Sequence, residues 1–84
     1  MTSFDLYGHN SSVIEMMDRA ERLENARDSG EQYYGGEPID NIIHQLYKMA
    51  EGHCKTVINS NVDESSKTWF IIKLNYIERK LTEK

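Results

Sequence analysis

The sequence predicts a small all-α protein of three helices, built on an antiparallel helical hairpin. Apolar residues recur at spacings of three and four over about 38–59, which is the period of one helix face. A second apolar pattern covers about 63–82, and the short segment NSNVDESS between them makes the two helices antiparallel neighbours. A narrower apolar stripe over about 13–28 predicts a weaker N-terminal helix.

The size of the chain predicts one domain with a thin core. Residues 1–84 are expected to form a single small helical domain, with residues 1–11 as an extended or flexible arm. A domain of this size buries only about 60% of the surface of its unfolded chain, and a partner subunit is a common remedy. Cys54 is the only cysteine, so no intramolecular disulfide can form. The chain has no apolar run of roughly 20 residues, which favours a soluble, cytoplasmic protein without membrane contact.

The first predicted helix has a start signal and a stop signal. Ser12 and Glu15 form an S-x-x-E pattern, in which each side chain satisfies a free N–H of the first turn. Gly30 is a natural end of the helix. The residues of its apolar face are Val13, Met16, Met17, Ala20 and Leu23.

The second predicted helix begins at Pro38. Proline suits the first helical position, and Asp40 lies near the positive end of the helix dipole. The apolar stripe extends over nearly the whole helix. Its members are Ile39, Ile42, Ile43, Leu46, Met49, Ala50, His53 and Val57.

The third segment, TWFIIKLNYI, can be read as a strand or as a helix. Its aromatic and β-branched residues alternate, which is typical of a strand over 68–77. The helical reading is favoured, because a lone strand has no partner in this chain and would expose an aggregation-prone edge. The cap is expected at Asn61, Asp63 or Ser66. On a helix, one face would carry Phe70, Leu74, Ile77 and Leu81.

A second, amphipathic face of this helix predicts a homo-oligomer. It consists of Trp69, Ile72, Lys73 and Tyr76. One hairpin and one weak helix do not easily cover both faces, so Trp69 and Tyr76 are expected to anchor a subunit contact. The alternative is that the first helix covers this face within the monomer.

The sequence offers no catalytic constellation, and the chain is predicted not to be an enzyme. His53 and Cys54 are adjacent on a helix and do not face each other, so they form no nucleophile–base pair. His9, His44, His53 and Cys54 match no zinc spacing, so no metal or cofactor is expected.

Two adjacent tyrosines and two adjacent glycines before the second helix suggest an alternative, a sequestering binder of a small nucleotide-like signal at a subunit interface. A helix N-terminus attracts anions, and tyrosine rings can stack on a base. No phosphate-loop motif is present, and Glu37 would repel a phosphate. The residues of this site would be Tyr33, Tyr34, Gly35, Gly36, Lys48, Lys67 and Lys73.

The function predicted from these features is that of a small acidic interaction protein. Such a short, acidic helical chain is typical of accessory or inhibitory proteins, such as those that phages make early. Its net charge is −4, and it would bind another protein through Tyr33, Tyr34 and the acidic residues Glu21 and Glu24 of the first helix. A partial DNA mimic is a further alternative. Direct binding of nucleic acid is not expected, because the sequence has no dense basic patch. The spacing of Trp69, Ile72 and Glu78 is similar to that in phage proteins that sequester cyclic nucleotide signals; it covers the third helix alone and assigns no family.

Overall fold

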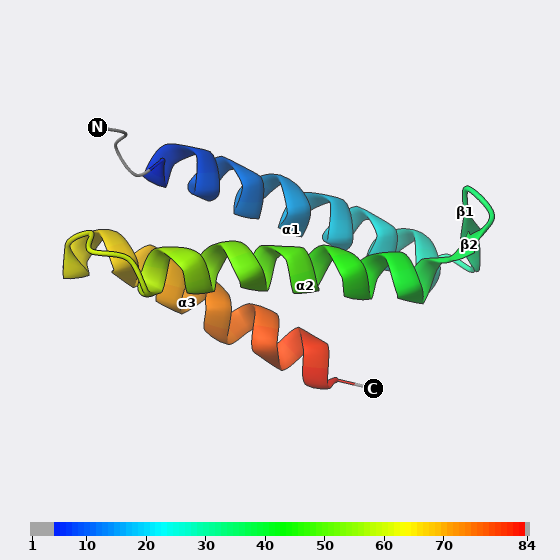
Figure 1. Ribbon diagram of the computed structural model, residues 1–84. Helices are drawn as coiled ribbons and strands as arrows, with labels where there is room; N and C mark the ends of the chain where they lie inside the picture. Colours follow the sequence, from blue (N-terminus) through cyan, green and yellow to red (C-terminus); the bar gives the residue numbers. More distant parts are fainter. Residues whose placement is uncertain (1–4, 84) are drawn as a thin grey trace.

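The computed structural model describes residues 5–83 and shows three helices with one short β-ribbon (Figure 1). The predicted all-α class and the helical hairpin are confirmed. The elements are α1 (Leu6–Asp28), β1 (Tyr33–Tyr34), β2 (Glu37–Pro38), α2 (Ile39–Ile58) and α3 (Glu64–Thr82). No helix within residues 5–83 has both the length and the apolar character that crossing a bilayer requires.

The start of α1 differs from the prediction. The helix begins at Leu6, so the predicted start at residue 13 is wrong, as is the predicted arm over residues 6–11; residues 1–4 lie outside the described part of the chain. Asp5 is the N-cap, and its Oδ1 accepts a hydrogen bond of 2.8 Å from the N–H of Gly8. A carboxylate at this position satisfies a free N–H and interacts favourably with the helix dipole. Ser12 is therefore inside the helix and caps nothing.

A two-residue turn joins the strands of the ribbon before α2. Tyr33 pairs with Pro38 and Tyr34 with Glu37 in antiparallel register. Gly35 and Gly36 have φ values of +59° and +85°, as a type I′ turn requires of both central residues, so glycine suits both positions. Pro38 thus belongs to β2, and α2 begins one residue later than predicted, at Ile39.

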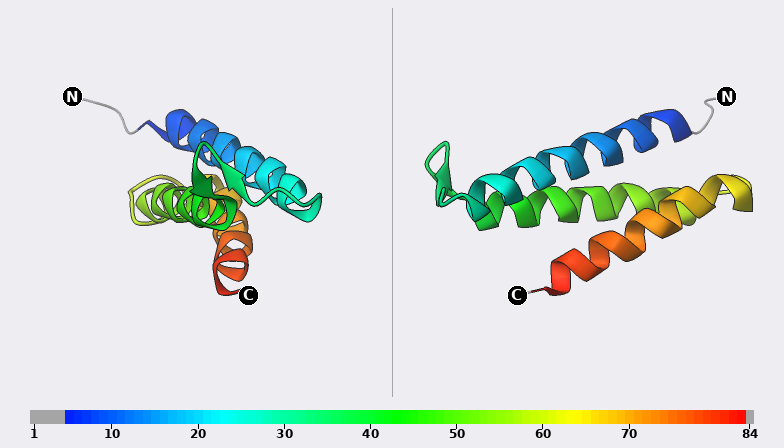
Figure 2. Two further views of the ribbon diagram at one scale, coloured as in Figure 1. Left: turned by 90° about the vertical axis from the view of Figure 1, so that its right-hand side faces the viewer. Right: turned by 180° about the vertical axis from the view of Figure 1, so that it is seen from behind.

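The second helix, α2, lies between the other two helices (Figures 1 and 2). The arrangement is long and thin, and its Cα atoms extend over 47 × 24 × 14 Å along the principal axes. Arg27 near the end of α1 bonds Asp40 at the start of α2, with 2.8 Å between Nη1 and Oδ1. This ion pair is exposed to solvent and is expected to contribute only weakly to stability.

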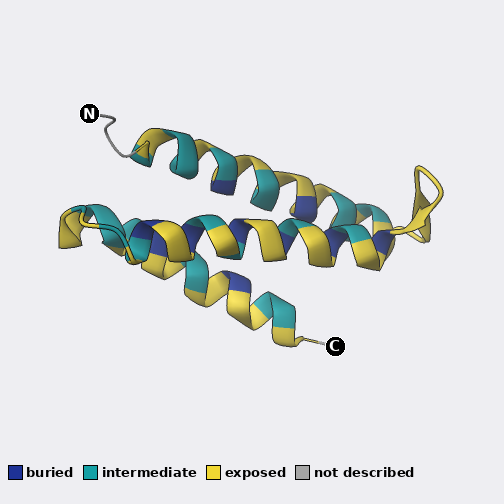
Figure 3. Cartoon of the chain, in the orientation of Figure 1, coloured by how far each residue is buried: buried dark blue, intermediate teal, exposed yellow. Residues whose placement is uncertain are grey.

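The buried residues of the core follow α2 (Figure 3), on a stripe that is turned around the helix from the predicted one. Tyr47 and Cys54 are buried in addition to predicted members of the stripe, whereas the predicted member Met49 is 52% exposed. The reason is that α2 has a neighbour on two sides, so its contact surface is turned around the helix toward α3. The buried residues are Val13, Ala20, Ile39, Ile43, Tyr47, Ala50, Cys54, Val57, Phe70 and Ile77.

The third segment is a helix, as predicted, and not a strand. Asp63 is its N-cap, one of the three predicted positions, although its side chain makes no capping hydrogen bond. Phe70 and Ile77 are buried, and Leu74 and Leu81 pack against the core. The face of α3 predicted to be apolar is therefore the face that contacts α2.

Truncation of Ile77 tests this core. Ile77→Ala is expected to lower the unfolding free energy by about 2–5 kcal/mol, because a fully buried side chain leaves a cavity. Ile14→Ala, which truncates a half-exposed isoleucine of α1, is the matched control and is expected to change it by less than about 1 kcal/mol. Urea denaturation at one protein concentration measures both values. Equal losses in the two variants would contradict the packing described.

Candidate functional site

The first candidate site is a groove between α1 and α3, which we call the α1–α3 groove. Its volume is about 280 Å³. Side chains of α1 and α3 form its walls, and a tyrosine of α2 lies between them. The lining residues are Met17, Glu21, Tyr47, Ile72, Lys73 and Tyr76.

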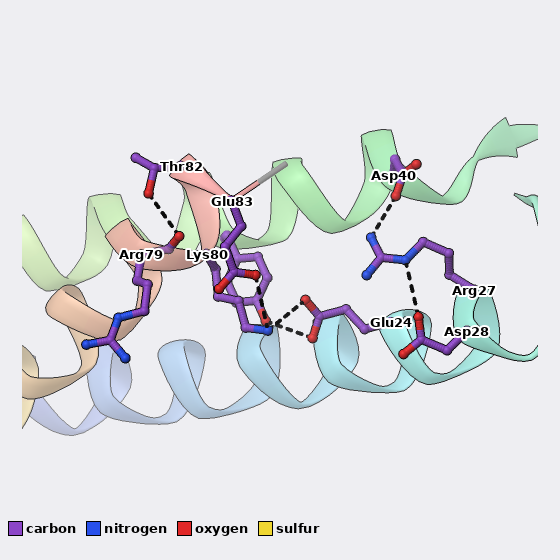
Figure 4. A network of polar contacts seen from close by, with 9 residues as sticks. Glu24, Arg27, Asp28, Asp40, Arg79, Lys80, Thr82 and Glu83 are labelled. Carbon is purple, nitrogen blue, oxygen red and sulfur yellow. Dashed lines mark hydrogen bonds and ion pairs between the residues drawn. The ribbon is translucent and has the colours of Figure 1, made fainter.

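A polar cluster near this groove joins all three helices. The Tyr47 hydroxyl of α2 donates a hydrogen bond of 3.2 Å to Oε1 of Glu24 on α1. Lys80 of α3 places its Nζ 3.4 Å from the other oxygen of the same carboxylate (Figure 4). The Glu24 side chain is only 15% exposed. The sequence placed Glu24 on a solvent-facing acidic surface, whereas its carboxylate is engaged within the molecule.

The environment of Tyr47 keeps its hydroxyl protonated. Burial raises the pKa of Tyr47 far above its ordinary value, and the negative charge of Glu24 raises it further. The phenol therefore remains a hydrogen-bond donor to Glu24 throughout the neutral range. It thus acts as a structural contact between α1 and α2.

The amphipathic face of α3 is partly open to solvent. We call Trp69, Ile72, Lys73 and Tyr76 the exposed α3 face. Ile72 is 60% exposed and Tyr76 42% exposed, so α1 does not cover them. Trp69 is partly buried, with its ring 4.9 Å from that of Phe70 in an edge-on arrangement. The Nζ of Lys73 lies 5.3 Å from the centre of the Trp69 ring, within the range of a cation–π contact.

The predicted ligand residues are not brought together within one chain. Tyr33 and Tyr34 are 62% and 65% exposed on the ribbon. Lys67 lies near the start of α3, at the opposite end of α2 from the ribbon (Figure 1). Lys48 forms an ion pair of 3.2 Å with Glu51, and Lys73 lines the α1–α3 groove.

Tyr34 instead lines a larger cavity with two arginines of α1, which we call the arginine cavity. It has a volume of about 650 Å³. Arg19 and Arg22 pair with acidic residues one turn earlier, at 3.3 and 3.2 Å. Such exposed pairs are weak, so both guanidinium groups can turn to a ligand. The lining residues are Arg19, Arg22, Leu23, Ala26, Glu31, Tyr34, Ile42 and Leu46.

Two histidines meet at the other end of α1 and α2. The Nδ1 atoms of His9 and His53 are 2.8 Å apart, and the ring centres are 5.0 Å apart. Burial lowers the pKa of His53, and the proximity of His9 lowers it further. The sequence analysis missed this pair because it assigned His9 to a flexible arm. The helical spacing from Leu6 onward was the signal that could have found it.

The remaining candidate groups lie apart. Cys54 is buried, as expected of a packing residue, and burial raises its pKa to about 11, so the thiol is not a nucleophile at neutral pH. His44 is exposed on α2. Within residues 5–83, no three side chains of His, Cys, Asp or Glu gather in a way that could hold a metal ion.

Comparison with known proteins gives no relative for this chain. No family model, no curated protein and no solved structure matches it. Its function is therefore inferred from its own surfaces: the α1–α3 groove, the exposed α3 face, the arginine cavity and the histidine pair.

The histidine pair predicts a pH-dependent stability. The pKa of His53 in the folded protein lies below the ordinary 6.5, so the unfolded chain binds a proton first as the pH falls. The stabilisation is complete above about pH 6.5 and is lost as the pH falls from there through the lowered pKa. Urea denaturation between pH 8 and pH 5 measures this slope.

Two histidine variants identify the source of the slope. His53→Gln is expected to flatten it, whereas His44→Gln, which changes an exposed histidine of the same helix, should retain it. An unchanged slope in His53→Gln would show that the histidine pair does not couple folding to pH.

Proposed function

We propose that the protein is a small non-enzymatic interaction protein, a homo-oligomer that acts as an accessory or inhibitory protein by binding another protein. The observation that carries this proposal is the exposed α3 face. On this face, more than half of the surface of Ile72 and somewhat less than half of that of Tyr76 are exposed to solvent. Large aromatic and apolar side chains in such a position are typical of interface anchors.

The thinness of the molecule supports a subunit contact. Stable domains usually bury apolar faces between at least two layers of secondary structure. Here α1 and α3 both pack on α2, and the Cα atoms extend only 14 Å along the shortest axis. A second copy laid over the exposed α3 face would supply the missing cover.

Charges on the two walls of the α1–α3 groove suit a two-fold contact. Glu21 comes from the α1 wall and Lys73 from the α3 wall. In a two-fold dimer the same patch meets itself, and an axis along the groove would place Glu21 of one subunit opposite Lys73 of the other. Opposite charges in this arrangement fix the register of a contact.

The acidic side of α1 is a weaker basis for partner binding than the sequence suggested. Glu24 is engaged within the molecule, and Glu15 and Asp18 each pair with an arginine. Glu21 remains exposed beside the groove. This alternation of charges favours a mixed contact with a protein over a mimic of DNA, which requires dense negative charge.

A charge placed on the exposed α3 face tests the proposal. In light scattering, the wild-type protein is expected to have a mass of at least two chains of 9.8 kDa each. Ile72→Asp is expected to yield the monomer mass, because a buried unpaired carboxylate would destabilise the contact. Met49→Asp is the matched control, since Met49 is similarly exposed but lies on α2.

The same variants test binding of another protein. Ile72→Asp is expected to capture at least tenfold less partner protein from extract of the source cells than the wild type does. Met49→Asp is expected to capture as much as the wild type. A wild-type mass of 9.8 kDa at high protein concentration would refute the homo-oligomer. Equal capture by all three proteins would refute the use of this face.

A second candidate function, sequestration of a nucleotide-like signal, is supported by the arginine cavity. Guanidinium groups bind phosphate with paired hydrogen bonds, and a tyrosine ring can stack on a base. Arg19, Arg22 and Tyr34 line one cavity whose volume suits a small ligand. Glu31 also lines this cavity and would repel an anion, so binding would depend on both arginines.

Melting temperatures in a panel of mono-, di- and cyclic nucleotides test this second candidate. A ligand at ten times its Kd is expected to raise the midpoint by at least about 4 °C through binding to the folded state. Arg22→Gln should abolish the rise, whereas Arg79→Gln, which changes an exposed arginine of α3, should retain it. No rise for any nucleotide at millimolar concentration would refute sequestration.

A further inference from the structure

The contact between His9 and His53 is the only described approach of two imidazole rings from different helices within residues 5–83. His9 lies in the second turn of α1, and His53 lies in the last two turns of α2. Both side chains are partly buried, so their positions are restrained by packing while one side remains open to solvent. We propose that His9 and His53 form a binding site for a divalent transition-metal ion.

The separation of the two nitrogens suits such an ion. A metal bonds an imidazole nitrogen at about 2.0–2.1 Å, so two ligands at a right angle lie about 2.9 Å apart. The observed distance between the two Nδ1 atoms is 2.8 Å. Tetrahedral ligands would lie about 3.4 Å apart, farther than this pair. The present separation therefore matches that of adjacent ligands of nickel or copper in tetragonal or octahedral coordination.

The surrounding chemistry agrees with a site of nitrogen ligands. A hydrogen bond between two Nδ1 atoms requires one of them to accept, so at least one ring carries no proton on that nitrogen. On metal binding, the donating ring would give its Nδ1 proton to solvent and take one up at Nε2, so that both neutral rings turn an Nδ1 lone pair toward the ion. Cys54 faces the core as a protonated thiol and does not contribute. Calcium and magnesium prefer oxygen ligands, which this pair does not supply.

The two histidines supply only part of a coordination sphere, and water would occupy the remaining positions. Such a site nonetheless joins two helices, because the ligands are 44 residues apart in the sequence. The unfolded chain does not hold these rings together, so binding would stabilise the folded state. It would hold the first turns of α1 against the end of α2.

Nickel ions and tag-free protein provide the test. Equilibrium dialysis is expected to find one ion per chain, and nickel at ten times its Kd should raise the melting midpoint by at least about 4 °C. Excess chelator should reverse the rise, and zinc should produce a smaller one. His9→Gln and His53→Gln should each abolish it, whereas His44→Gln provides the matched control and should retain it.

A spectroscopic test uses the wild-type protein alone, so its result does not depend on whether the histidine variants fold. Nickel should broaden the NMR signals of the His9 and His53 ring protons first and leave those of His44 sharp. Broadening of His44 alone, or of all three rings equally, would overturn the proposal. So would the absence of saturable binding, or a rise in the midpoint that persists in His53→Gln.

Discussion

The packing of α1 and α3 against the same central helix is the contact on which the rest of the structure depends. The buried residues Ile43, Tyr47, Ala50 and Cys54 recur at spacings of four, three and four, so they form one helical stripe that both neighbours share. Because α2 shares this surface between two neighbours, neither neighbour covers the other completely. The α1–α3 groove and the exposed α3 face both follow from this division.

The carboxylate of Glu24 fixes how α1 and α3 lie relative to each other. It is bonded by Tyr47 of α2 and paired with Lys80 of α3, so one side chain of α1 contacts both other helices. Removing these groups from water costs free energy. The ion pair between Glu24 and Lys80 recovers that cost only when the helices are aligned so that the two side chains meet. Among the described residues of α1 only Val13 and Ala20 are fully buried, and its other apolar side chains pack on the core while partly exposed. A polar contact is therefore a reasonable means of setting its position.

The sequence predicted the elements whose signals are local, and it missed the features that depend on neighbours. The periodic pattern of α2 and the helical face of Phe70 and Ile77 were sufficient to place both helices. The start of α1 was missed because the segment before Val13 is largely polar, and its helix is supported by the cap at Asp5. Met49 was assigned to the core because periodicity cannot show on which side a third helix will pack.

The candidate sites were less predictable than the fold, because they are formed by residues distant in sequence. The sequence singled out Tyr34, but only the path of the ribbon places it beside Arg19 and Arg22. Histidines 9 and 53 carry no spacing motif, and they meet only because α1 and α2 are antiparallel and of similar length. The exposed α3 face could be predicted, since its residues recur on one helix; its exposure depends on where α1 lies.

The positions of these sites along α1 connect them physically. The histidine pair lies near the first turns of α1, the arginine cavity near its last turns, and Met17 and Glu21 between them line the groove. An α-helix is stiff over this length, so a ligand that holds either end of α1 against α2 also restrains the wall of the groove. Binding at one end would then favour a contact at the groove by reducing the entropy lost when that contact forms.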